Sequence, residues 1–123
     1  MRASESLPVA GLSPSELTDL IGRISASRHF RRALRVRAFL EYVCGETLAG
    51  RAELINEQAV GHRVFGRLPD YDCAADNIVR VEARELRKRL AAYYDDEGAA
   101  DPVLIRMPKG RYAVTFEPRE AAE

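Results

Sequence analysis

Positively charged side chains recur at helical spacing between Asp76 and Tyr94. Arg80, Arg84 and Lys88 stand four residues apart, so they share one face of a helix. Like charges at this spacing repel each other, and helix stability alone does not favour the arrangement. Guanidinium groups can read the edges of bases in the major groove of DNA, and a small apolar side chain such as Val81 can contact a thymine methyl group. The pattern therefore predicts a helix that recognises double-stranded DNA.

The same helix has a second side that suits a protein core. At about 100° per residue its apolar residues form one stripe, made of Val79, Ala83, Leu86, Leu90 and Tyr93. The opposite, outward side adds Asn77 and Glu85 to the basic residues, with Arg87 on its flank. An alternative interpretation is a solvated basic face that Glu85 partly neutralises through Lys88 and Arg89.

Two helices are predicted in the first half of the chain. Ser13 and Glu16 form a capping-box pattern with a proline between them, which predicts a helix that ends near Ser25 to Ser27. A second, longer helix is predicted from Phe30 to about Leu48, and Gly50 is placed to end it. This second helix carries arginines that either contact a phosphate backbone or form the exposed side of a core helix: Arg31, Arg32, Arg35 and Arg37.

A short third helix is predicted immediately before the basic one. It runs from Asn56 to Phe65, with Asn56 as its cap and Gly66 after its end. A turn-rich link from Leu68 to Ala75 follows. Asp76 is placed to cap the basic helix, because a carboxylate is favoured at the positive end of the helix dipole.

Two β-like runs follow the basic helix. Val103–Met107 and Arg111–Phe116 alternate between apolar and polar residues and are joined by Pro108-Lys109-Gly110, which predicts an antiparallel hairpin. Lys109 and Arg111 make its tip basic. Before the hairpin, Gly98 is predicted to adopt the left-handed conformation that closes a helix. The expected fold class is mostly α with a C-terminal β-hairpin.

The length of 123 residues suits one domain. We expect it to cover residues 13–117, with a flexible leader at 1–12 and a flexible tail at 118–123. Nineteen basic and nineteen acidic residues give no net charge, which counts against DNA binding because such domains are commonly basic. The placement of charge matters more, since the segment from Asp76 to Leu90 holds five basic and three acidic residues.

No catalytic, metal or cofactor site is predicted. His29 and His62 are isolated from any cysteine, serine or paired carboxylate at useful spacing. Asp70, Asp72 and Asp76 lack the glycine and terminal glutamate of a calcium loop, so turn and capping roles are expected for them.

The cysteines and the hydropathy pattern bear on the compartment. Cys44 and Cys73 are widely spaced and form no CxxC motif, so reduced thiols are expected. No apolar run reaches the roughly 20 residues that span a bilayer, and the N-terminus lacks the apolar region of a secretory signal. A cytoplasmic protein with no membrane partner is predicted.

Three sets of residues resemble the pattern of a known family. Polar residues precede a short helix that ends in Val64-Phe65-Gly66, where the family has Val-Trp-Gly. The family's helix pattern Val-x-Val-x-x-Arg-x-Leu-Arg-Lys-x-Leu is met by Val79, Val81, Arg84, Leu86, Arg87, Lys88 and Leu90. Its hairpin pattern is met by Lys109, Gly110 and Tyr112, with Arg111 in place of a second glycine. In these features the stretch from about Asn56 to Phe116 resembles the OmpR-type winged helix-turn-helix output domain of bacterial response regulators.

This resemblance implies a tri-helical core with a wing. The extra N-terminal helix predicted from Ser13 to Ser27 departs from the family, because it stands in place of the family's small sheet. The resemblance implies a bacterial transcription regulator, located at the nucleoid when bound, that forms a homodimer on repeated half-sites. It implies base contacts from Arg80, Val81, Arg84 and Glu85. Arg87 and Lys88 would contact phosphates, and Lys109 and Arg111 would reach the backbone or the minor groove.

A second departure from the family limits what the resemblance implies. No segment of the chain resembles a receiver domain, so the family's phosphorylation switch is not expected. Residues 30–117 are also similar to an uncharacterised bacterial domain found at the start of longer signalling proteins. The alternative function is a winged-helix adaptor that binds other regulatory proteins without DNA, which the zero net charge and Glu85 favour.

Overall fold

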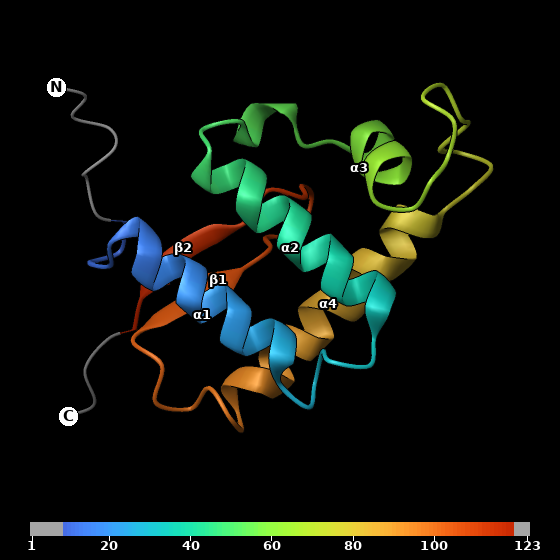
Figure 1. Cartoon of the computed structure of the whole chain (residues 1–123). Helices are drawn as coiled ribbons and strands as arrows, with labels where there is room; N and C mark the ends of the chain where they lie inside the picture. Colours follow the sequence, from blue (N-terminus) through green and yellow to red (C-terminus); the bar gives the residue numbers. More distant parts are fainter. Residues whose placement is uncertain (1–8, 120–123) are drawn as a thin grey trace, which may run out of the picture.

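The computed structural model describes residues 9–119 (Figure 1). Within them, four α-helices precede a two-stranded antiparallel hairpin, which confirms the predicted coarse fold class. A single turn of 3-10 helix, Ala52–Leu54, was not predicted and lies between the second and third helices. The elements are α1 (Pro14–Ala26), α2 (Leu34–Leu48), α3 (Glu57–Arg63), α4 (Ile78–Tyr94), β1 (Val103–Arg106) and β2 (Thr115–Pro118).

α1 forms as its capping residues predict. The Ser13 hydroxyl accepts a hydrogen bond from the Glu16 N–H at 3.2 Å, and the Glu16 carboxylate accepts one from the Ser13 N–H at 2.8 Å. The residues just before α1 correct the predicted leader. Val9 and Leu12 exchange two backbone hydrogen bonds of 2.9 Å across a tight turn. The leader prediction for residues 1–8 lies outside the described residues.

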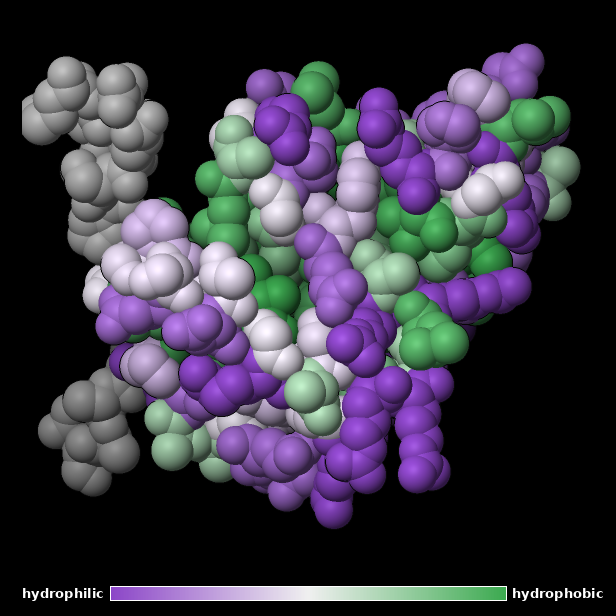
Figure 2. All heavy atoms as spheres, in the orientation of Figure 1, coloured by the Kyte–Doolittle hydropathy of each residue, from purple (hydrophilic) through white to green (hydrophobic). Residues whose placement is uncertain are grey.

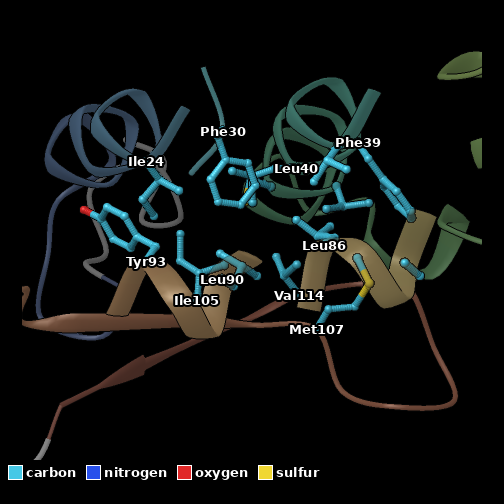
Figure 3. Packing of buried hydrophobic residues seen from close by; sticks show 14 of the residues in the cluster. Ile24, Phe30, Phe39, Leu40, Leu86, Leu90, Tyr93, Ile105, Met107 and Val114 are labelled. Atoms are coloured by element: carbon cyan, nitrogen blue, oxygen red, sulfur yellow. The ribbon is translucent and has the colours of Figure 1, made fainter. Parts of the chain in front are cut away.

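α2 begins at Leu34, so the predicted start at Phe30 is wrong. Residues 27–33 form a turn instead, in which the Ser27 carbonyl accepts hydrogen bonds from the N–H groups of Phe30 and Arg31. The turn brings the Phe30 ring, which is fully buried, between α1 and α2 and over α4 (Figure 3). The predicted end is confirmed, because Gly50 has a φ of +81° and the next N–H bonds to the Glu46 carbonyl at 2.9 Å.

α3 begins as predicted and is shorter than expected. Asn56 caps it by accepting a hydrogen bond from the Ala59 N–H at 2.8 Å. The helix ends at Arg63, before the predicted Phe65, and Gly66 follows with a φ of +72°.

α4 begins at Ile78, so the prediction that it starts at Asp76 with that residue as its cap is wrong. The N-cap position belongs to Asn77, whose side chain makes no capping hydrogen bond. Asp76 lies one residue before the N-cap. Its carboxylate still bonds to a backbone N–H at the start of the helix, since it accepts a hydrogen bond from the Ile78 N–H at 3.2 Å. The other carboxylate oxygen accepts one from Arg67 Nε at 2.7 Å, which fixes the preceding link.

The core lies between the three long helices and the hairpin. α1 and α2 lie side by side over α4 (Figure 1), and side chains from all of them meet Ile105, Met107 and Val114 of the hairpin (Figure 3). The predicted apolar stripe of α4 is confirmed, since each of its residues is buried: Val79, Ala83, Leu86, Leu90 and Tyr93. On the side where α1 and α2 are seen, hydrophilic residues lie beside patches of hydrophobic residues (Figure 2).

The hairpin is shorter than predicted, with a longer connection. β1 and β2 pair from Val103 opposite Pro118 to Arg106 opposite Thr115. The prediction that a strand starts at Arg111 is wrong, because residues 107–114 form a loop, here called the hairpin loop. Met107 and Val114 at its two ends are buried in the core, and its carbonyls bond to a side chain of α4 rather than to an opposite strand.

Two further expectations near the C-terminus are corrected. Gly98 does not adopt the left-handed conformation. It is needed for close packing, because a Cβ there would collide with the Tyr93 ring. The predicted tail is ordered at residues 118–119, where the Arg119 N–H donates to the Pro102 carbonyl at 2.8 Å. Residues 120–123 lie outside the described part of the chain.

Candidate functional site

The circumference of α4 has four parts: a buried stripe, two grooves and an exposed strip. At about 100° per residue, the buried stripe occupies one side of the helix. Next to it, Arg80, Ala83, Arg84 and Arg87 line a groove against the hairpin loop, here called the hairpin groove. On the other side of the stripe, α4 lines a second groove against the residues around the start of α2, here called the turn groove, with Glu82, Glu85 and Arg89. A strip of exposed residues lies between the two grooves.

This exposed strip contains the centre of the predicted contact face. Asn77, Val81, Arg84 and Lys88 are all exposed, and Val81 is 52% exposed despite being apolar. Within residues 9–119, neither Arg84 nor Lys88 has a carboxylate partner. The strip therefore offers a partner two unpaired cations, an amide and an apolar side chain, as the sequence predicts.

The hairpin groove concentrates positive charge beside the strip. It encloses about 490 Å³, and five of its lining residues are basic while none is acidic. Lys109 and Arg111 reach it from the exposed part of the hairpin loop, on either side of Gly110. Gly110 has a φ of +89°, a conformation that glycine adopts without steric cost. The structure thus brings the predicted loop cations next to Arg80 and Arg84.

Arg87 is used within the fold itself. Its Nε donates to the Met107 carbonyl at 2.8 Å, and its Nη2 donates to the carbonyls of Pro108 at 3.0 Å and Arg111 at 3.2 Å. One guanidinium group therefore holds both sides of the hairpin loop. The resemblance implied a phosphate contact for Arg87, and its hydrogen bonds in the structure are to the loop that carries Lys109 and Arg111. The only sequence signal of this role was its place on the flank of the outward side.

Arg80 connects α4 to α3. Its Nη1 donates to the Glu57 carboxylate at 2.6 Å, and Glu57 lies in the first turn of α3. The pair leaves Arg80 on the rim of the hairpin groove, with one donor group committed to α3. Arg80 can still present its remaining N–H groups to a partner, because a guanidinium has five donors.

The link between α3 and α4 is fixed by a network that sequence reasoning did not find. Gln58 donates from Nε2 to the carbonyls of Pro69 at 2.9 Å and Tyr71 at 2.8 Å. The Tyr71 ring lies so close to Gly61 that a Cβ there would collide with it. Arg67 holds the pKa of the Asp76 carboxyl below its ordinary value, mainly through their hydrogen bond. These contacts set the position of α3 relative to α4.

The turn groove contains both signs of charge. It encloses about 410 Å³, and its remaining walls come from Arg32 to Val36. Glu85 pairs with Arg89 at 2.7 Å, which confirms the predicted neutralisation by that arginine. Glu82 pairs with Arg35 at 3.8 Å. Both glutamates therefore already have cationic partners inside the fold.

The residues set aside as catalytic or metal candidates have structural partners. His29 Nε2 lies 3.0 Å from Asp96, and His62 Nδ1 lies 2.7 Å from the Arg67 carbonyl. The ligand atoms of His29, Asp96 and Glu97 lie within 4.8 Å of one another, but Arg28 pairs with the same Asp96 at 2.8 Å. Asp96 Oδ2 is thus shared by Arg28 and His29, and Glu97 accepts a hydrogen bond from the Arg28 N–H at 3.0 Å.

The two cysteines are free thiols, as expected. Burial raises the pKa of the Cys44 thiol above its ordinary value. Cys73 is half-buried and donates from Sγ to Gln58 Oε1 at 3.3 Å. No helix within residues 9–119 is long and apolar enough to cross a bilayer.

Comparison of the chain with protein-family models, with curated proteins and with solved structures finds no match. The resemblance to the OmpR-type output domain therefore stays a prediction that depends on the residues quoted for it.

Proposed function

We propose that the chain binds double-stranded DNA, with α4 in the major groove and the hairpin as a wing. In this proposal α3 and α4 form the helix-turn-helix, and α2 completes a tri-helical core. The fold is then a winged helix-turn-helix with α1 as an extra N-terminal helix. The biological role that follows is transcription regulation in bacteria.

The observation that carries the proposal is the position of the unpaired cations. Arg84 and Lys88 of the exposed strip, together with Lys109 and Arg111 of the hairpin loop, have no carboxylate partner within the described residues. They converge on one side of a chain whose net charge is zero. Positive charge gathered on one side attracts a polyanion, because the electrostatic potential at a surface depends on where the charges lie and not only on their sum.

The dimensions of a helix such as α4 are compatible with the major groove of B-DNA. A helix with its side chains is about 10–12 Å across, and the major groove of B-DNA is about 12 Å wide. With α4 in the groove, Val81 and Arg84 face base edges, and Arg80 and Glu85 border them. Lys88, Lys109 and Arg111 are then placed near phosphates. Glu85 bonds to Arg89 through Oε2, so its other carboxylate oxygen can accept a hydrogen bond from a cytosine amino group.

Selection of bound sequences from a random DNA pool, followed by fluorescence anisotropy on the selected duplex, tests this function. Three to six phosphate contacts predict a slope of log Kobs against log salt between about −3 and about −5. We expect the combined Arg84→Ala and Lys88→Ala substitutions to weaken binding to the selected site by roughly tenfold or more, since one good base contact is worth about 1–3 kcal/mol.

The matched control removes two arginines that line neither groove. Arg37 and Arg51 are paired with Glu41 and Glu46 on the surface, and replacing both by alanine changes the charge equally. This control is expected to bind the selected duplex as the wild type does. Absence of wild-type binding at low salt would reject the DNA proposal and leave the protein-binding adaptor as the better interpretation.

A further inference from the structure

The turn groove lies opposite the hairpin groove across the exposed strip. The residues of α4 that line the two grooves leave Asn77, Val81 and Lys88 between them on the helix circumference. The strip therefore has a basic loop on one side and the residues before α2 on the other. The second side includes the arginines of residues 31–35. From the sequence, these arginines either contact a phosphate backbone or form the exposed side of a core helix.

The charge on the turn side is positive once its pairs are counted. Three arginines that line the turn groove, namely Arg32, Arg35 and Arg89, together with the preceding residue Arg31, stand against Glu82 and Glu85. Each glutamate already pairs with one arginine. Arg31 and Arg32 are exposed, and within residues 9–119 their guanidinium groups make no hydrogen bond or ion pair. Two uncompensated cations remain on this side.

The position of these cations is fixed by the fold. Arg89 donates from Nη1 to the His29 carbonyl at 2.7 Å, which ties the turn at 27–33 to α4. The fully buried Phe30 ring anchors the same turn from within the core. Arg31 and Arg32 follow this anchor directly, and the Arg31 N–H donates to the Ser27 carbonyl at 2.8 Å. The fold therefore fixes the backbone of Arg32, which lines the turn groove, and of Arg31 immediately before it.

We propose that Arg31 and Arg32 contact the phosphates of the DNA strand on the far side of the major groove from the hairpin loop. This inference rests on the proposed function. Phosphates border the major groove on both sides, and a helix that fills the groove brings whatever flanks it close to both strands. In this arrangement Lys109 and Arg111 contact phosphates of one DNA strand, and Arg31 and Arg32 contact phosphates of the other. Arg37 has no part in it, since it pairs with Glu41 at 3.2 Å and lines neither groove.

The test measures binding to a random-sequence duplex at several salt concentrations. It compares the slope of log Kobs against log salt for the wild type and for the Arg31→Ala, Arg32→Ala double variant. Loss of two phosphate contacts reduces the magnitude of the slope by about 1.8, at about 0.9 per contact. The Arg37→Ala, Arg51→Ala variant, with the same loss of charge, is expected to keep the wild-type slope. Thermal unfolding of each variant checks that the fold is intact.

A charge-preserving variant separates a phosphate contact from a structural effect. Arg31→Lys with Arg32→Lys is expected to restore the wild-type slope, because a phosphate accepts either cation. If the wild type binds DNA and the alanine variant keeps the full slope, this inference is wrong and the turn is a solvated or protein-facing surface. If the wild type itself does not bind DNA, the proposed function fails instead.

Discussion

Arg84 and Arg87 lie three residues apart on α4 and have the same chemistry, but their surroundings differ. Arg84 is exposed and has no carboxylate partner within residues 9–119, whereas Arg87 donates three hydrogen bonds to carbonyls of the hairpin loop. A rotation of about 60° around the helix separates them. A basic side chain on this helix is therefore not always available to a partner. Its availability depends on the hydrogen bonds and ion pairs that it already makes within the fold.

The same division holds for the apolar residues of α4. Leu86 is fully buried against the other helices, and Val81 is half-exposed on the strip. Burial of an apolar side chain stabilises the fold, while an exposed one contributes little. One helix thus separates residues that hold the domain together from residues that remain exposed to solvent, and substitutions can address the two sets independently.

The largest expected difference in the free energy of unfolding is between the Leu86→Ala and Val81→Ala variants. Leu86→Ala should lower the free energy of unfolding by about 2–5 kcal/mol, because it leaves a cavity in the core. Val81→Ala should change it by less than about 0.5 kcal/mol, since its side chain faces solvent. Urea denaturation measures both. Equal losses of stability would show that Val81 is packed, and would remove it from the exposed strip.

Sequence patterns predicted the parts of the fold that depend on local spacing. The capping box of Ser13 and Glu16, the cap at Asn56 and the buried stripe of α4 follow from short-range hydrogen bonding and helical periodicity. The exposure of Val81 and Arg84 follows from the same periodicity. For these residues the outcome needs only the helix and a core on one side of it.

The parts that could not be predicted depend on contacts between distant residues. Phe30 lies next to a helical pattern, but its burial among three helices pulls residues 30–33 into a turn. Residues 111–114 have a strand-like pattern, but Arg87, more than twenty positions earlier, takes up carbonyls of the loop. Gly98 is needed because a Cβ there would collide with the Tyr93 ring, and not because the backbone is left-handed. Spacing along the chain contains no signal of such pairings.

The Arg87→Ala variant sharpens the contrast with Arg84. We expect it to lower the free energy of unfolding by about 1–3 kcal/mol, because charged hydrogen bonds to the loop carbonyls are lost. It should also change the amide chemical shifts of residues 107–114. Arg84→Ala should change stability by less than about 0.5 kcal/mol, as expected of an exposed residue without partners. NMR spectra and urea denaturation of the two variants compare these effects directly.

The outcome for DNA affinity distinguishes positioning from contact. Arg87→Ala should weaken DNA binding through displacement of Lys109 and Arg111, so adding substitutions at those two residues should weaken it little further. Such non-additivity is expected when residues act through one another. Fully additive losses would contradict a positioning role for Arg87 and favour a direct contact. Arg84→Ala and the loop substitutions should instead combine additively.

The smallest expected effect concerns the N-terminal end of α4, where the buried and exposed sides meet. Arg67 holds the pKa of Asp76 below its ordinary value of 3.8, so their pairing stabilises the fold above that value and is lost as pH falls through the folded-state pKa. Asp76→Asn should therefore be less stable than wild type at neutral pH, with a difference that shrinks as the solution is acidified. Urea denaturation across this pH range measures it. Asp70→Asn, an exposed position in the same link, should match wild type at neutral pH. A deficit of Asp76→Asn that stays constant into acid would mean that the side chain acts through shape rather than charge.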